Sequence, residues 1–252
     1  STPSPRPTMA VFSRITLLAG TAARCVHAMN RRGLAMANPT ATFKTTKGEF
    51  KVELFQDQLP ITTSNFKDLA TSGFYDGLTF HRVIKGFMCQ FGCPNSANPQ
   101  SPIAGTGGPP DGQFKNLATG GMETRSRGGN IKDENISKDS NLPGTLSMAN
   151  TGAPNTGGSQ FFINVVHNDF LDFFTPGESK HPVFGAACSD ADLATMIKIS
   201  KVKTRDDCPI NPVKMVSVIV DMLSQNPPFS SSLIIDLIRF CVPEPHVAEH
   251  SP

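Results

Sequence analysis

Two short apolar stretches, about seventy residues apart, constrain the fold of this 252-residue chain more than any other feature. The first, residues 80–90, alternates as a half-buried β-strand does and places Arg82 on a face shared with Phe80 and Ile84. The second, residues 159–164, places an amide and a phenylalanine on one face and apolar groups on the other. A cation among large apolar groups is costly to bury unless it has a partner or a task. Two core strands with a surface arginine would give this pattern, and so would an apolar pocket around one fixed positive charge.

The composition is that of a loop-rich globular protein. Glycine and proline occur 21 times each, which disfavours a long helical bundle, and 38% of the residues are hydrophobic, which suffices for a full core. A net charge of +2 gives no reason to expect nucleic acid as a partner. The six cysteines form no CxxC pair, so we predict free thiols in a reducing compartment and no metal site. No apolar run is long enough for a membrane-spanning helix, and no membrane association is expected.

Charge divides the chain into three segments. Residues 1–40 hold five arginines and no acidic residue, and their apolar residues recur near helical spacing, as in a mitochondrial targeting segment. We therefore expect a mitochondrial protein; a disordered basic extension, or translation from upstream of the true start, is the alternative and would leave the protein cytoplasmic. The globular body is expected over residues 41–220. Residues 221–252 are expected to form either a disordered C-terminal tail, which we favour, or a helix that docks a partner.

Short strands and two helices are predicted for the body. The hydroxyls of residues 62–64 would cap a helix that ends at Gly73, and Asp190 would cap a second helix. Residues 94–129 are dense in Gly, Pro, Asn and Ser and are predicted to be one long loop. Many antiparallel strands with two helices indicate a barrel or a sandwich. Besides the strand pair within residues 80–90, alternation predicts strands at residues 41–46, 49–55, 145–149, 160–166, 182–188 and 213–220.

Both stretches resemble one family. The first resembles the signature strand of the cyclophilins, the cyclosporin-binding class of peptidyl-prolyl isomerases (rotamases). The second, preceded by residues 146–150 and by Gly157-Gly158, is similar to the partner strand of that family in order and spacing. The resemblance covers residues 41–220. It implies a mainly β protein, a closed antiparallel eight-stranded barrel with a helix over each open end, and an isomerase or folding chaperone that needs no cofactor and no metal.

The resemblance also gives Arg82 a task. The barrier to rotation about an X-Pro amide, on the order of 20 kcal/mol, comes from resonance between the nitrogen lone pair and the carbonyl. In the twisted transition state the lone pair localises on the prolyl nitrogen, and a fixed donor aimed there stabilises that state more than the planar one. Arginine suits this role because it stays charged and presents several donors in a fixed fork. By resemblance, Arg82 is the donor and Gln160 supports it.

The family's other site residues match positions in this chain. The proline ring would lie among large apolar side chains with a histidine at the edge, and amides would bind the peptide backbone. The catalytic set is Arg82, Phe87, Gln90, Phe162 and His181. The substrate-binding set is Met88, Ala149, Asn150, Thr151, Gln160, Phe170 and Leu171.

The chain departs from the family pattern at one site residue and in three loops. Phe170 stands where most relatives have a tryptophan, so the indole donor is lost and we expect weakened cyclosporin A binding. Residues 91–94, Phe-Gly-Cys-Pro, replace the usual pair of glycines after Gln90, and residues 109–130 and 173–179 are longer than in compact members. We expect a monomer that acts on proline-containing peptides and unfolded proteins. A non-catalytic module that binds proline peptides, or a scaffold that acts through its loops and tail, are the alternatives.

Overall fold

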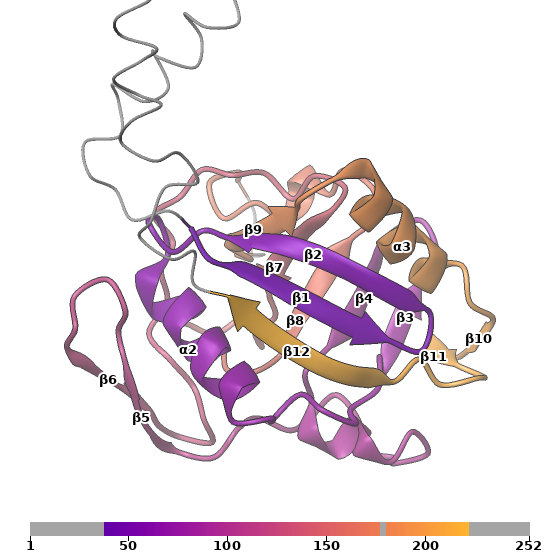
Figure 1. The fold of residues 1–252 in the computed structure, drawn as a ribbon, viewed down its shortest axis with the longest axis horizontal. Helices are drawn as coiled ribbons and strands as arrows, with labels where there is room; N and C mark the ends of the chain where they lie inside the picture. Colours follow the sequence, from indigo (N-terminus) through magenta and orange to yellow (C-terminus); the bar gives the residue numbers. More distant parts are fainter. Residues whose placement is uncertain (1–37, 177–179, 222–252) are drawn as a thin grey trace, which may run out of the picture. The chain divides into compact units, whose positions relative to one another are not determined.

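An eight-stranded antiparallel sheet forms the centre of the protein (Figure 1). The computed structural model describes residues 38–176 and 180–221. In the sheet, strands distant in sequence lie side by side, in the order β12-β1-β2-β9-β7-β8-β4-β3. The strands are β1 (Thr40–Thr45), β2 (Gly48–Leu54), β3 (Arg82–Ile84), β4 (Met88–Phe91), β7 (Thr145–Met148), β8 (Phe161–Asn164), β9 (Val183–Ala187) and β12 (Met215–Asp221).

The sheet is curled, and β12 and β3 are its two ends. Between these ends the described residues form one isolated bridge, Thr79 to Lys214. Backbone hydrogen bonds accompany it, from the Phe80 amide to the Val213 carbonyl at 3.1 Å, from the Gly77 amide to the Met215 carbonyl at 2.9 Å and from the Met215 amide to the Leu78 carbonyl at 2.8 Å. A mainly β fold with two helices is therefore confirmed. The strand pairs of the described residues do not form a closed ring, so closure into a barrel stays a prediction.

Helix α2 (Pro60–Thr71) begins differently from the prediction. The hydroxyls of residues 62–64 do not cap it, because these residues lie inside the helix and are buried. The carboxylate of Glu134 accepts hydrogen bonds from the Ile61 amide at 2.9 Å and the Thr62 amide at 2.7 Å instead. A negative charge at a helix N-terminus is favourable because it faces the positive end of the helix dipole. The predicted stop is confirmed, since Gly73 has a φ of +72° directly after the helix.

Helix α3 (Asp190–Ser200) is also capped by a different residue from the one predicted. Asp190 is the first residue of the helix, and the cap is Ser189, whose hydroxyl accepts a hydrogen bond of 3.3 Å from the Asp192 amide. Met196 and Ile199 are its fully buried apolar residues, with 0% exposure. The helix packs against β2 through these side chains and thereby covers part of the core.

An aromatic core explains why the alternating segments became strands. Phe43 of β1 stacks on Phe50 of β2 with ring centroids 4.8 Å apart, and Phe66 of α2 meets Phe161 of β8 edge-on at 5.7 Å. Phe43, Phe50 and Phe161 are at most 1% exposed. Burying such large apolar rings is the main source of stability of the sheet.

The segment 94–129 is more structured than predicted. It contains the short helix η1 (Pro94–Ala97) and a hairpin of β5 (Gly112–Lys115) and β6 (Met122–Arg125). The prediction of one long loop was wrong because each strand has only four residues, too few for alternation to stand out among turn residues. The hairpin has its own anchor, since Phe114 is 1% exposed and lies beneath the guanidinium of Arg125 at 5.1 Å.

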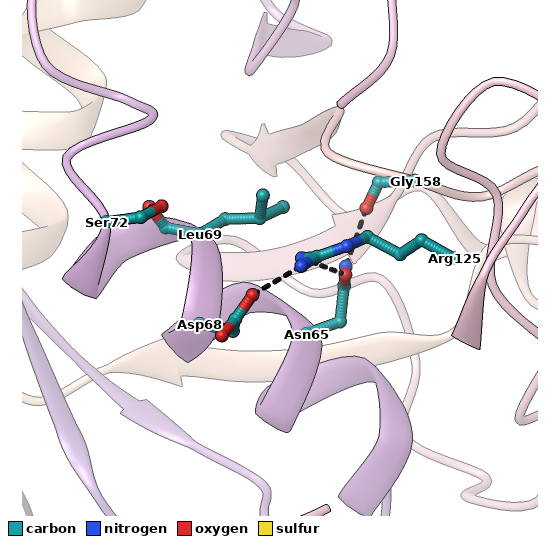
Figure 2. Close-up of polar contacts among 6 residues, drawn as sticks. All are labelled: Asn65, Asp68, Leu69, Ser72, Arg125 and Gly158. Atoms are coloured by element: carbon teal, nitrogen blue, oxygen red, sulfur yellow. Dashed lines mark hydrogen bonds and ion pairs between the residues drawn. The ribbon is translucent and has the colours of Figure 1, made fainter. Parts of the chain in front are cut away.

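Arg125 also ties the hairpin to α2 (Figure 2). It pairs with the carboxylate of Asp68 and donates a hydrogen bond of 3.2 Å to the side-chain oxygen of Asn65. The amide nitrogen of Asn65 in turn donates a bond of 2.8 Å to the carbonyl of Gly158 (Figure 2). The guanidinium is 8% exposed, and a buried charge needs such partners. The hairpin is therefore held to the body by side chains rather than by strand pairing.

The remaining elements are short. They are η2 (Asp169–Leu171), β10 (Thr204–Arg205) and β11 (Cys208–Pro209). Within the described ranges, no helix combines the length and apolarity needed to cross a membrane, and no group of three or more His, Cys, Asp or Glu side chains could hold a metal ion. Of the predicted targeting segment (1–40) and C-terminal tail (221–252), residues 1–37 and 222–252 lie outside the described residues, while Thr40 and Asp221 belong to β1 and β12.

Candidate active site

Strand register joins the two stretches that the sequence singled out. Arg82 lies opposite Gln90 in the β3–β4 pair, and Gln90 lies opposite Phe162 in the β4–β8 pair. Directly opposite residues of antiparallel strands present their side chains on the same face. Arg82, Gln90 and Phe162 therefore form one row across three strands.

The other face of the same strands belongs to the core. Val83, Cys89 and Ile163 lie opposite one another in the neighbouring row and are at most 1% exposed. The sequence pattern left open whether Arg82 sits on core strands or at an apolar pocket, and both descriptions apply, one to each face. The prediction that Phe80 shares the face of Arg82 was wrong. Phe80 precedes β3 and packs in the core with Phe91, their ring centroids 5.0 Å apart.

The side chain of Arg82 is accessible and only loosely held. It is 46% exposed, and its Nε lies 3.6 Å from a carboxylate oxygen of Asp207, whose side chain is 49% exposed. Asp207 sits in the turn between β10 and β11, and its carbonyl accepts a bond of 2.7 Å from the Val83 amide. An exposed pair of this kind contributes little to stability. Arg82 thus keeps a fixed place on the sheet while its charge remains available to a ligand.

A small apolar cluster, separate from the main core, lies beside this row. Met88, Phe162 and Leu171 are 2%, 5% and 7% exposed, and Phe87 and Ala149 pack against them. These are the side chains that were predicted to surround a proline ring, and the fold brings them together from β4, β8, η2 and the segment after β7.

His181 stands at the edge of the cluster, as predicted. Its ring meets that of Phe162 edge-on at 5.3 Å, and its Nδ1 lies 2.8 Å from the carbonyl of Met148. A carbonyl can only accept, so Nδ1 carries the proton in this contact. Burial lowers the pKa of His181, and the neutral ring is therefore the form present at neutral pH.

Phe170 lies at the outer side of the cluster. Its side chain is 59% exposed and stacks on Phe87 with ring centroids 5.8 Å apart. The apolar surface expected at this position is present, and no nitrogen donor accompanies it.

Gln160 contacts Gln90 directly. The amide nitrogen of Gln90 donates to the side-chain oxygen of Gln160 at 3.0 Å. The nitrogen of Gln160 donates to the carbonyls of Gly105 and Gly107, each at 2.8 Å. Because Gln90 lies opposite Arg82, the predicted support of Arg82 by Gln160 would have to pass through Gln90.

A groove adjoins the row and the apolar cluster. It encloses a cavity of about 610 Å³. Asn150 donates a bond of 2.7 Å to the Lys180 carbonyl, and Thr151 bonds to Thr156, so both side chains are held in place by the protein itself. The lining residues are Gln90, Gly105, Thr106, Gly107, Gly108, Arg127, Gly128, Asn130, Ala149, Asn150, Thr151, Thr156, Gly158, Ser159 and Gln160.

The structure adds two residues that the prediction missed. His81 is one: both ring nitrogens are buried without a hydrogen-bond partner, and burial lowers its pKa to about 4. It borders the groove wall, because a Cβ at Gly105 would lie 3.1 Å from its ring. Alternation places it on the strand face opposite that of Arg82, but nothing in the sequence indicated that its ring nitrogens would be buried.

Cys93 is the other. It is 0% exposed, and its sulfur accepts hydrogen bonds from the amides of Gly105 at 3.1 Å and Gly107 at 3.2 Å. The same two glycines give their carbonyls to Gln160, so this wall of the groove is held from both sides. The departure at residues 91–94 was the available signal, but sequence alone did not show what the thiol would contact.

We expect Cys93→Ala to weaken peptide binding while Cys89→Ala does not. Both thiols are 0% exposed, but Cys93 alone of the two holds the groove wall through hydrogen bonds. Cys89→Ala should cost about 1–2 kcal/mol of stability, and Cys93→Ala somewhat more because two backbone amides lose their acceptor. Only Cys93→Ala should raise KM for a proline peptide, by about threefold. Urea unfolding and steady-state kinetics measure the two effects. Equal KM changes in both variants would contradict this role of Cys93.

Comparison with known proteins agrees with this fold. Residues 40–220 match the family model described as cyclophilin type peptidyl-prolyl cis-trans isomerase/CLD. This match spans the whole described sheet and both helices. The chain belongs to the cyclophilin-type peptidyl-prolyl cis-trans isomerase family.

Individual relatives carry the same description. A peptidyl-prolyl cis-trans isomerase of Synechococcus elongatus is 40% identical over 153 residues, covering 61% of this chain and 83% of that protein. One of Rhizopus delemar is 36% identical over 181 residues, covering 71% of this chain but 24% of that protein. The chain spans 26% of the mouse peptidylprolyl isomerase domain and WD repeat-containing protein 1, to which it is 34% identical. It thus matches about a quarter of the length of these two larger relatives.

Two crystal structures of a Cryptosporidium parvum cyclophilin type peptidyl-prolyl cis-trans isomerase are also similar. The first has a TM-score of 0.57 and 26% identity, with coverage of 75% of this chain and 99% of the other. The second, obtained in the presence of the dipeptide Ala-Pro, has a TM-score of 0.55 and 27% identity, with coverage of 72% and 98%.

Proposed function

We propose that this protein is an isomerase that accelerates rotation of X-Pro bonds in peptides and unfolded proteins. The observation that carries the proposal is the row Arg82–Gln90–Phe162, in which one accessible guanidinium lies in register with a phenylalanine of the apolar cluster. Family membership supports the reaction, and the Ala-Pro dipeptide used with the C. parvum relative supports the class of ligand.

The mechanism follows from the two sides of the site. The cluster of Met88, Phe162 and Leu171 excludes water from the bound proline ring, and burying that ring supplies binding energy. The guanidinium of Arg82 donates to the prolyl nitrogen as its lone pair localises in the twisted state. That contact is stronger in the transition state than in the planar ground state, so it lowers the barrier rather than merely tightening binding. No bond to the peptide is made or broken.

Gln90 has a supporting role in this mechanism. Its nitrogen is occupied by Gln160, which leaves its side-chain oxygen to accept from the peptide backbone next to the proline. The edge histidine, neutral because of its lowered pKa, adds ring surface without placing a second cation near Arg82.

Refolding of a protein whose slow phase is limited by proline isomerisation tests the physiological side of the proposal. The uncatalysed phase lasts tens to hundreds of seconds. A substoichiometric amount of this protein should shorten it in proportion to the amount added. A slow phase that keeps its rate at every concentration would contradict the proposal.

We further propose that cyclosporin A binds weakly because Phe170 lacks an indole donor. Phe170→Trp should restore a hydrogen bond at an exposed position and tighten inhibition by about tenfold, since one such bond contributes about 1 kcal/mol or somewhat more. The turnover of a proline peptide should change little, because the ring that stacks on Phe87 is kept. Inhibition curves for the two proteins decide this, and equal drug sensitivity would refute it.

A further inference from the structure

A second cavity continues from the groove. It encloses about 410 Å³ and shares Arg127 and Asn130 with the first cavity. Its lining residues are Thr124, Ser126, Arg127, Asn130, Ile131, Lys132 and Asn155. Most of these belong to β6 or to the turn that follows it. The inserted hairpin and the residues after it thus extend the groove away from the proline cluster.

This extension has a fixed position on the body. Arg125, two residues before Arg127, is bound to Asn65 and Asp68 of α2 (Figure 2). Asn65 also holds the carbonyl of Gly158, which lines the first cavity (Figure 2). One buried network therefore anchors both the hairpin and the groove wall.

The turn that carries Arg127 is also held in shape. The amides of Gly128 and Gly129 donate to the carboxylate of Asp111 at 2.9 and 2.7 Å. Ser126 and Asn130 exchange backbone hydrogen bonds of 2.9 and 2.8 Å on either side of Arg127. The backbone of Arg127 is thus placed where the two cavities meet.

The charged residues that line the two cavities are all cations. Arg127 is the single charged residue in the lining of the first cavity, and Lys132 joins it in the second. Both side chains are exposed, and neither takes part in an ion pair among the described residues. Two acidic residues adjoin this lining without forming part of it: Asp111 accepts from the amides of Gly128 and Gly129, and Asp133 accepts from the Asn155 amide at 2.7 Å.

We propose that this extension is a binding subsite for an acidic side chain of the peptide, a few residues from the proline. The proposal rests on the proposed isomerase function, since it assumes that the proline occupies the apolar cluster. Arg127 and Lys132 would pair with a glutamate or aspartate carboxylate, and Arg127 can do so with two parallel hydrogen bonds. Substrates with an acidic residue at one defined distance from the proline are therefore preferred over neutral ones.

Peptide binding tests this directly. Each peptide of a set contains one Ala-Pro pair and a single glutamate, whose position before or after the proline differs from peptide to peptide. A twin of each peptide has glutamine in place of the glutamate. We expect one glutamate position to lower Kd by about fivefold relative to its twin, as one or two partly exposed ion pairs allow. The difference should shrink in 0.5 M NaCl because salt screens exposed charges.

Matched variants locate the effect. Arg127→Gln and Lys132→Gln together should abolish the glutamate preference, while Lys115→Gln, an exposed cation of the same hairpin outside both cavities, should leave it intact. Equal Kd values for all glutamate and glutamine twins in the natural protein overturn the subsite, as does a preference that survives in the double variant. Isomerase turnover of the same peptides is measured in parallel, so that failure of the isomerase proposal and failure of the subsite proposal give different results. A glutamate preference without turnover supports the subsite and refutes the isomerase function.

Discussion

Replacement of Arg82 by alanine is expected to lower kcat/KM on an Ala-Pro peptide by about a hundred- to a thousandfold. The loss is of this size because the guanidinium is the one group assigned to the charge that develops on the prolyl nitrogen, and removal of such a donor typically has this cost. The effect should fall mainly on kcat, since the apolar cluster that binds the ring is untouched. Steady-state kinetics separates the two constants.

Stability provides the control for this variant. The side chain of Arg82 is 46% exposed and its ion pair with Asp207 is loose, so Arg82→Ala should change the free energy of unfolding by about 0.5 kcal/mol or less. Arg82→Lys keeps the charge but not the fork and should recover a small part of the activity. A stable alanine variant that retains full turnover would refute the role of Arg82.

Gly92→Ala is expected to be strongly destabilising. Gly92 has a φ of +95°, and a Cβ there would lie 2.2 Å from the carbonyl oxygen of Ser159. Neither backbone can move easily, because Ser159 bonds to the Gly92 carbonyl at 2.7 Å and to the Tyr75 hydroxyl at 3.2 Å. Backbone strain and this overlap together should cost about 3–5 kcal/mol, which urea unfolding measures.

Gly86→Ala is the matched control for that loss. Gly86 also has a positive φ, +72°, but nothing lies within 4 Å of a Cβ built there. Gly86→Ala should therefore lower the free energy of unfolding only by the cost of the left-handed conformation, about 1–2 kcal/mol. The same loss in both variants would mean that the close approach of Gly92 to Ser159 is not a constraint on the fold.

The strands and the site row could be predicted because they depend on local alternation. Residues 80–90 and 159–164 each have one apolar and one mixed face. The register of β3, β4 and β8 aligns the mixed faces in the single row of Arg82, Gln90 and Phe162. The resemblance of the same residues to a family then supplied the histidine and the apolar cluster, which alternation could not have placed.

The features that were missed all depend on contacts between distant segments. Glu134 caps α2 from 72 residues away, and no propensity near residue 60 indicates it. Arg125 can be buried because Asn65 and Asp68 of α2 bind its guanidinium. The hairpin that the sequence indicated as a loop is therefore anchored to α2. The acceptor role of Cys93 likewise appears only once the glycine loop folds back onto it.

Exchange spectroscopy on a short Ala-Pro peptide tests whether Arg82 catalyses rotation of the X-Pro bond. NMR follows the interconversion of the cis and trans forms in the peptide itself, with the natural protein or with Arg82→Ala added in catalytic amounts. We expect exchange far faster than the uncatalysed rate with the natural protein and near-uncatalysed exchange with the variant, although both bind the peptide. Uncatalysed exchange with the natural protein, or equal acceleration by both proteins, would contradict this role of Arg82.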